Sequence, residues 1–400
     1  MVFVMKKRGK DKTRNTGCCL GLVQSMKRLS RVLPVAVFFL MIVAGMAAGI
    51  LQKDKTYSSA ENRTLQLFPK FTVKRVLNGK FQKKYEKYLS DQFPGRDSWV
   101  KLQTATERAF GKTESNGVYF GKDGYLLEKY AEKDIDNKMA DKNIKVLGKF
   151  VKEASKVSDV KVMMAPSKTF TLESYLPAFA ETYNENIFYD KLEKKLPDNV
   201  LIDIYSILSK HADENIFYRT DHHWTTQGAW YAYSAYNQAC GKDDSVAEAK
   251  KKLKKVSGDF LGTTFSKVNM YSQKDEISIY EPENEMEVVY NMGEKTENTF
   301  YQTKFLKKKD KYSMFFGGNQ AVLEISGGVK NNKTLFIVKD SFANCIIPFL
   351  AEDYEKVVVA DMRHLNIGMT MLLRNYKPTD VLVLYNTIQF MQDREFALKL

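Results

Sequence analysis

With 400 residues, of which 44% are hydrophobic and 12% aromatic, the chain can bury a sizeable core, and these proportions exclude a disordered protein. The formal net charge is +14 at pH 7, but residues 1–31 carry nine Lys or Arg against one acid and so hold +8 of it. This uneven placement predicts a membrane topology signal, and we expect no nucleic-acid partner.

An uncharged run of twenty residues, 32–51, follows the basic tail 1–31. As a helix it is about 30 Å long, the thickness of a bilayer core. The basic flank predicts a cytoplasmic N-terminus, with everything after residue 51 outside the cytoplasm. A cleaved signal peptide is the alternative, because small residues stand at 45 and 47–49. The run is long for a signal peptide, so we favour an uncleaved, single-pass anchor in the cell membrane.

The rest of the chain divides by composition. Residues 52–115 are polar and mostly helical, and we expect a stalk or helical flap. Residues 116–400 form the expected catalytic domain, which opens with a hairpin around the Asp123-Gly124 turn. Lysine-rich residues 241–330, with short strand-like pieces, are expected to be an inserted β-rich flap.

Strands and helices alternate through most of this domain. Strands are expected at 160–165, 200–204, 216–218, 334–338, 357–360 and 381–385, with helices between several of them. Continuous apolar strands in repeated strand–helix units predict an α/β fold, with a parallel sheet covered by helices on both faces.

Two segments carry residues suited to catalysis. Asp221-His222-His223-Trp224 follows the expected strand 216–218, and Ser341 follows the expected strand 334–338. In an open α/β sheet, the carboxyl ends of the strands meet at one edge, where ligands bind. A serine hydroxyl needs a base, histidine suits that task near neutral pH, and an aspartate fixes the histidine tautomer. The pattern therefore predicts a serine, histidine and aspartate triad.

Side chains alternate along an extended segment, so Asp221 and His223 should share one side. His223 is then the expected base, and His222 points the other way for a structural role or a substrate contact. Trp224 is a further candidate for substrate contact.

Two alternatives stay open. Asp361 and His364 have the Asp-x-x-His spacing found in many serine esterases and could serve Ser341 instead. A zinc site could use Asp221, His222, His223 and His364, but adjacent histidines do not easily face one ion, and no paired-ligand motif is present. We expect neither a metal nor a cofactor.

Taken together, the segments Asp221–Trp224 and Asp340-Ser341-Phe342 resemble the bacterial DHHW family. More distantly, the chain is similar to the SGNH-like domain of alginate O-acetyltransferases. Further similar segments lie after the expected anchor, at 121–125, 166–168 and 259–264.

The resemblance implies an SGNH-like fold with Ser341 as nucleophile, His223 as base and Asp221 as the residue that orients it. It also implies action outside the cytoplasmic membrane, often with a membrane-bound O-acyltransferase as acetyl donor. The sequence departs from the family at Lys339, where a glycine is usual, and the usual oxyanion-hole blocks are not evident. Asn386 is a candidate oxyanion donor.

From these features we expect a membrane-anchored acyltransferase that passes an acyl group, expected to be acetyl, from Ser341 to a cell-surface polysaccharide. The alternatives are an acetyl or carbohydrate esterase with the same triad, and a non-catalytic carbohydrate-binding module at the cell surface.

Overall fold

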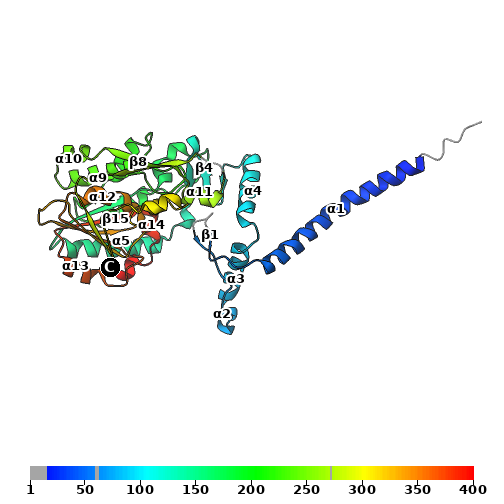
Figure 1. Ribbon diagram of the computed structural model, residues 1–400, viewed down its shortest axis with the longest axis horizontal. Coiled ribbons are helices and arrows are strands. Elements are labelled where there is room, and N and C mark those ends of the chain that lie inside the picture. The colour runs from blue at the N-terminus through cyan, green and yellow to red at the C-terminus, as the bar shows by residue number, and fades with distance from the viewer. Residues whose placement is uncertain (1–15, 59–62, 271–272) are drawn as a thin grey trace, which may run out of the picture. The chain divides into compact units, whose positions relative to one another are not determined.

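The computed structural model describes residues 16–58, 63–270 and 273–400. It divides into two compact units (Figure 1). Of the described residues, unit 1 comprises 16–58 and Arg63–Arg96, and unit 2 comprises 97–270 and 273–400. Residues 1–15 of the expected basic tail lie outside the described residues.

Unit 1 begins with the helix α1 (Thr16–Leu51). Its stretch Ser30–Gly49 is, among the described residues, the candidate for a membrane span by length and composition. A short antiparallel pair follows, β1 (Tyr57–Ser58) with β2 (Arg63–Thr64). Two helices complete the unit, α2 (Val73–Leu77) and α3 (Lys80–Asp91). Thr72 caps α2 by accepting from the Arg75 amide, and Gly79 takes the left-handed conformation (φ 70°) that separates the two helices.

Unit 2 is built on an eight-stranded sheet in the order β11-β10-β12-β14-β13-β15-β6-β7. Five adjacent strands of it are parallel: β14 (Lys356–Asp361), β13 (Thr334–Lys339), β15 (Asp380–Asn386), β6 (Asp159–Ala165) and β7 (Leu201–Ile202). The central residues of β13, β14 and β15 are almost wholly apolar, because these strands are buried on both faces of the sheet.

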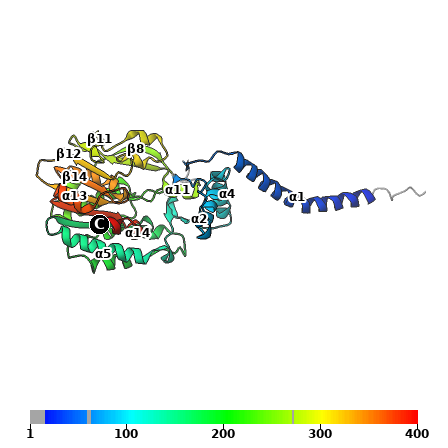
Figure 2. The same ribbon diagram turned by 90° about the horizontal axis from the view of Figure 1, so that it is seen from below.

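Both faces of this sheet are covered. On β13, Leu335 and Ile337 pack in one core cluster while Phe336 and Val338 pack in the other. The first cluster includes side chains of α8 (Ile204–Lys210), α9 (Thr226–Ala239) and α12 (Ile347–Ala351). The second includes side chains of α5 (Asn137–Ala154), α7 (Asn186–Glu193), α13 (Met369–Tyr376), α14 (Thr387–Gln392) and α15 (Phe396–Lys399). Figure 2 shows α5 on the opposite side of unit 2 from β8 and β11.

The expectation of a parallel sheet is corrected at one edge, where the sheet is mixed. β10 (Glu287–Tyr290), β11 (Lys295–Glu297) and β12 (Val322–Ser326) run antiparallel to their neighbours. They come from residues 241–330, so this segment is only in part a separate flap and otherwise extends the main sheet. The reason is local: β10 and β11 are joined by a tight turn at 291–294, and a parallel pair would need a crossover of a dozen or more residues.

Smaller elements surround the sheet. The hairpin expected around Asp123 and Gly124 is confirmed, as β4 (Val118–Phe120) and β5 (Leu126–Glu128) pair antiparallel, with β3 (Glu114–Ser115) beside β4. A second hairpin joins β8 (Leu253–Phe260) to β9 (Asp275–Tyr280). The remaining helices are α4 (Arg96–Ala109), α6 (Lys168–Thr171), α10 (Asp244–Glu248) and α11 (Thr263–Val268).

Candidate active site

Ser341 lies at the carboxyl end of β13, where the sequence places it. Asp340 follows the strand, and a 3₁₀ turn, Ser341–Cys345, begins directly after it. One carboxylate oxygen of Asp340 accepts from the Phe342 amide at 2.9 Å, and the other accepts from the Asn386 amide at 2.9 Å. Asp340 therefore ties the serine turn to the end of β15, while Ser341 itself stays partly exposed.

Asp221 and His223 lie in a tight loop, which corrects the expected sheet strand at 216–218. An isolated bridge joins Phe217 to Trp224, and the Tyr218 amide donates to the His223 carbonyl at 3.2 Å. The chain thus turns back on itself between these residues. The argument from alternating side chains does not apply there, because the segment is bent.

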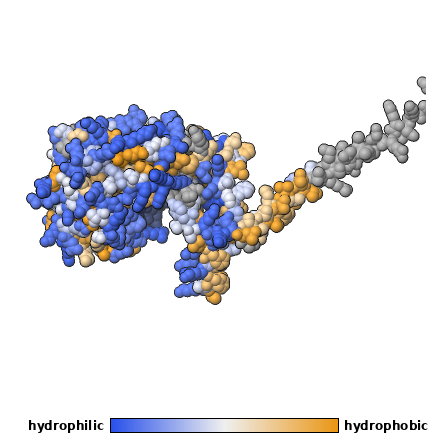
Figure 3. Space-filling model, viewed as in Figure 1, coloured by the Kyte–Doolittle hydropathy of each residue, from blue (hydrophilic) through white to orange (hydrophobic). Residues whose placement is uncertain are grey.

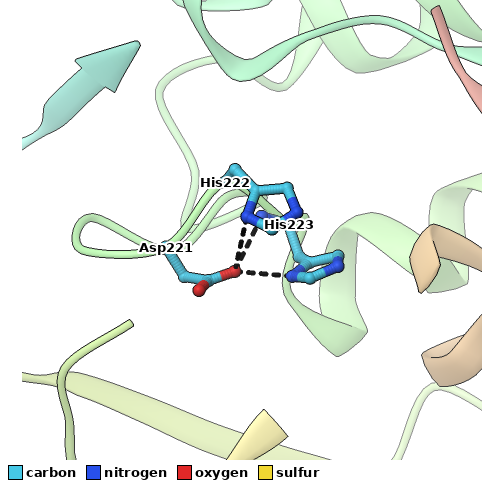
Figure 4. Close-up of side chains that lie close together, drawn as sticks. All are labelled: Asp221, His222 and His223. Carbon is cyan, nitrogen blue, oxygen red and sulfur yellow. Dashed lines mark hydrogen bonds and ion pairs between the residues drawn. The ribbon is translucent and has the colours of Figure 1, made fainter. Parts of the chain in front are cut away.

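The loop nevertheless brings the expected three side chains together. His223 Nε2 lies 2.8 Å from Ser341 Oγ, and His223 Nδ1 lies 2.6 Å from Asp221 Oδ1. Both distances are those of hydrogen bonds. Figure 4 shows the Asp221 carboxylate reaching both neighbouring histidines. An ionised carboxylate only accepts, so Nδ1 of His223 carries the proton and Nε2 is free to accept the serine proton.

The protonation states of His223 and Asp221 suit this arrangement. The pKa of His223 is lowered to about 4, chiefly by burial and further by His222, against the opposing effect of Asp221. Burial alone would raise the pKa of Asp221. The two histidines, with hydrogen bonds from His223 and Thr263, outweigh burial and hold that pKa well below its ordinary value. At neutral pH the site therefore holds a neutral imidazole beside an ionised carboxylate.

Asp221 is fixed from a second side by the start of α11. Its Oδ2 accepts from the Thr263 amide at 2.7 Å and from the Thr263 hydroxyl at 3.0 Å. Gly262 precedes this threonine, and a Cβ there would lie 2.3 Å from both Cβ and Oδ2 of Asp221. Only glycine leaves room for the carboxylate at this position.

The bent loop is held by two buried charged residues. Lys168 Nζ donates to the carbonyls of Tyr218, Arg219 and Asp221 at 2.9, 3.2 and 2.6 Å. Asp275 accepts from the amides of Arg219 and Thr220 at 2.7 and 2.8 Å. These bonds satisfy backbone groups that a strand would have paired in a ladder. Burial lowers the pKa of Lys168 to about 8.

Two aromatic residues connect the loop to the serine turn. Tyr312 stacks on His223, with ring centroids 4.0 Å apart, and its hydroxyl donates to the Ser341 carbonyl at 3.1 Å. Trp224 is completely buried, and its Nε1 donates to the Phe342 carbonyl at 2.9 Å. The structure therefore corrects the expected substrate contact by Trp224: this side chain supports the serine turn from behind.

His222 makes its hydrogen bond to a residue outside the proposed triad. Its Nδ1 lies 2.7 Å from the Thr263 hydroxyl, and its ring, two-thirds buried, lines a small pocket with Phe342 and Asn386. The other lining residues are Glu128, Tyr130, Ser167, Lys168 and Thr169. Burial raises the pKa of Glu128, but Lys267 and His222 reverse this effect and lower it to about 2. The pocket therefore contains an ionised carboxylate beside His222.

The side chains of Asn386 and Asp361 are engaged by other partners. Asn386 caps α14 by accepting from the Gln389 amide at 3.2 Å, and its Nδ2 donates to the Ala165 carbonyl at 3.1 Å. Asp361 receives two hydrogen bonds from the Arg363 guanidinium, at 2.9 and 2.6 Å, and its Oδ2 lies 3.5 Å from Lys339 Nζ. His364 is exposed. The structure thus brings Ser341 to His223, while the carboxylate of Asp361 pairs with two cations.

A metal is a poor fit for the Asp221–His223 pair. Ligand atoms of Asp221, His222 and His223 lie within 4.8 Å of one another. In a tetrahedral zinc site with bonds of about 2 Å, neighbouring ligand atoms lie roughly 3.3 Å apart. The 2.6 Å between Nδ1 of His223 and Oδ1 of Asp221 is shorter and fits a hydrogen bond between them.

Sequence reasoning missed several supporting residues. Thr263 and Lys168 fall in short segments noted only for their family resemblance, 259–264 and 166–168, and nothing there indicated contact with Asp221 or its loop. Tyr312 lies in the lysine-rich part of the chain, where no pattern indicated a site.

Comparison with known families gives one match over the larger part of the chain. The family model described as DHHW protein matches residues 130–360. Among curated proteins, the probable alginate O-acetylase AlgJ of Pseudomonas fluorescens is 25% identical over 217 residues, which is 51% of this chain and 50% of AlgJ. The chain therefore spans about half the length of that relative.

Solved structures share the fold. A DHHW family protein from Eubacterium siraeum has a TM-score of 0.60 at 24% identity, covering 72% of this chain and 96% of that one. The structure of Bacillus cereus PatB1 with a sulfonyl adduct has a TM-score of 0.58 at 20% identity, covering 71% and 98%. At these identities the likeness establishes the fold alone.

Proposed function

Because the chain belongs to the DHHW protein family, we propose that it is a serine O-acyltransferase that forms an acyl-enzyme on Ser341. The observation that carries this proposal is the continuous hydrogen-bonded line from Asp221 through His223 to Ser341 Oγ. Its order matches the roles of orienting acid, general base and nucleophile.

The reaction runs in two halves. In the first, Ser341 Oγ attacks the carbonyl carbon of the donor ester while its proton passes to His223 Nε2. The imidazolium then returns this proton to the leaving alcohol as the bond from the acyl carbon to the leaving oxygen breaks. In the second half, the acceptor hydroxyl gives its proton to His223 Nε2 and attacks the acyl carbon. The imidazolium then returns this proton to Ser341 Oγ as the bond from the acyl carbon to Oγ breaks. The backbone N–H of Ser341, at the start of the 3₁₀ turn, is our candidate donor to the oxyanion.

The acyl group and acceptor come from the resemblance and the curated relative. AlgJ is described as a probable alginate O-acetylase, so we propose acetyl as the group and a cell-surface polysaccharide as the acceptor. A membrane-bound O-acyltransferase is the proposed donor, and α1 the proposed anchor, with unit 2 outside the cytoplasm.

The test compares variants of the full-length protein in detergent. Ser341→Ala and His223→Ala should lower the turnover of a chromogenic acetyl ester by about 10⁴-fold. His364→Ala is the control, because His364 is exposed, and it should keep wild-type turnover. Loss in His364→Ala with activity retained in His223→Ala would refute the proposed triad.

A second measurement separates transfer from hydrolysis. Adding an oligosaccharide should divert acetyl from water to the sugar, and mass spectrometry of the sugar detects the product. Turnover without any acetylated sugar over a panel of acceptors would indicate an esterase with the same triad. A folded wild-type protein without turnover would indicate a binding module.

A further inference from the structure

The helices α2 and α3 carry an aromatic cluster that the described part of the chain leaves uncovered. Phe81, Tyr85 and Tyr88 share one face of α3, following the helical period. Phe68 lies edge-on to Tyr85 and Tyr88, with ring centroids 5.9 and 5.3 Å away, and Phe71 lies 5.5 Å from Phe81. Neither α2 nor α3 buries an apolar side chain.

We call residues 67–93 the α2–α3 hairpin, and its apolar exposure is large. Phe71 is 68% exposed and Leu77 is 82% exposed. Other exposed members are Leu67, Phe68, Val73, Tyr85, Leu89 and Phe93. In Figure 3, hydrophobic and hydrophilic residues lie next to each other on the hairpin. Contiguous apolar surface of this kind marks contact with a partner or a membrane.

The same hairpin is strongly basic. It carries two acids, Glu86 and Asp91, against seven cations: Lys70, Lys74, Arg75, Lys80, Lys83, Lys84 and Lys87. Asp91 is buried, and its carboxylate accepts from the Gln66 amide at 2.8 Å. A partner that offers both an apolar layer and negative charge therefore complements this surface, and the interface of an anionic bilayer offers both.

Hydrogen bonds tie this hairpin to the chain just beyond α1. Gln92 Oε1 accepts from the Lys55 amide at 2.9 Å, and Gln92 Nε2 donates to the Lys55 carbonyl at 2.9 Å. Gln52, the residue after α1, donates from its side chain to the Gln92 carbonyl at 3.3 Å. Near the end of α3, the Tyr88 hydroxyl donates to Asp54 at 3.0 Å. If α1 crosses the bilayer, these bonds hold the end of α3 where the chain leaves it.

We propose that the α2–α3 hairpin lies on the bilayer that α1 crosses, with its aromatic and aliphatic side chains in the interface and its lysines at anionic phospholipid head groups. Long lysine side chains can lie along apolar surface while their ammonium groups reach the phosphates. This inference rests on the membrane anchor of the proposed function, and it adds a second, peripheral membrane contact.

The test places a fluorescent probe on the hairpin in the full-length chain. Cys18, Cys19, Cys240 and Cys345 are replaced by serine or alanine, and an environment-sensitive dye is attached at Leu77→Cys. The control label is at Met292→Cys, which is 53% exposed in the turn between β10 and β11. Both proteins are reconstituted into vesicles of phosphatidylcholine with phosphatidylglycerol, with and without a nitroxide-bearing lipid as quencher.

The dye at residue 77 should be quenched by the nitroxide lipid at least threefold more than the dye at residue 292. Reversing Lys80, Lys83, Lys84 and Lys87 to Glu should at least halve this quenching. Equal quenching at both positions, or none at 77, would overturn the proposal. The proposal would also be overturned if the dye at residue 77 were shielded from water but not quenched by the nitroxide lipid, and if residue 77 could be cross-linked to a second copy of the chain.

Flotation of the vesicles separates this proposal from the anchor. Protein that floats with the vesicles but shows no quenching at 77 refutes the hairpin contact and leaves the anchor standing. Protein that fails to float refutes both. Ester turnover, measured in the same samples, reports on the catalytic part of the proposed function alone.

Discussion

His223 is buried between Tyr312 and His222, and this burial sets the acidic limit of the proposed reaction. A histidine acts as a base only when unprotonated, which means above its pKa. Since the pKa of His223 is lowered to about 4, the base form persists well into the acid range. A solvent-exposed histidine, with a pKa of about 6.5, would be mostly protonated at pH 5.

We therefore expect kcat/KM to stay constant from neutral pH down to about pH 5 and to fall about tenfold per pH unit below about pH 4. The measurement is acetyl ester turnover across this range. His222→Gln should shift the acidic fall in kcat/KM to higher pH, because His222 contributes to lowering the pKa of His223. A wild-type midpoint near pH 6.5 would contradict this account of the site.

For single residues, the sequence predicted which side chains form the proposed triad better than it predicted what each side chain contacts. The chemistry of serine, histidine and aspartate singles out Ser341, His223 and Asp221, although Ser341 and His223 are 118 residues apart. The contacts of Trp224 were not predictable, because an indole beside a reactive group suits a substrate contact and a buried support equally well. Only packing decides between the two.

The loop 217–224 is the element on which the site depends. The apolar run 216–218, which leads into the loop, resembles a strand. Hydrogen bonds that Lys168 donates and Asp275 accepts hold the loop in a bend instead. Such long-range bonds leave no periodic pattern in a sequence. The end of β13 is different: its apolar run is continuous, and the sequence predicted both the strand and the position of Ser341 after it.

Gly262→Ala tests the fit between this loop and α11. The added Cβ would lie 2.3 Å from the Asp221 side chain, so the carboxylate must move, and a shift of about 1 Å at such a position costs on the order of 100-fold in kcat. Gly258→Ala is the matched control, because the nearest atoms to its Cβ are the flexible end of Lys255 at 3.3 and 3.4 Å.

Turnover and thermal unfolding are measured on both glycine variants. The control should behave as the wild type in both. A Gly262→Ala protein with full turnover would show that Asp221 is not held as the structure describes.

For the whole molecule, the sequence predicted the class of fold but not the topology of one sheet edge. The apolar strands with intervening helices indicated an α/β protein. The antiparallel strands β10–β12 come from a segment whose short, polar pieces give little sign of a main sheet. Only β12 among them pairs with the parallel strands, through β14, which comes later in the chain.

All residues of the proposed triad and their supports belong to unit 2. Unit 1 contains the apolar helix α1 and the α2–α3 hairpin. We therefore propose that unit 2 carries out the chemistry and that unit 1 attaches the protein to the membrane.

The most direct test of the central claim is the intact mass of the protein after brief exposure to an activated acetyl ester and quenching in acid. We predict a mass increase of one acetyl group, located on Ser341 by peptide mapping. The adduct should be absent from Ser341→Ala and His223→Ala and present in His364→Ala. An acetyl group on any other residue, or an unchanged adduct on Ser341 in His223→Ala, would contradict the proposed roles of Ser341 and His223.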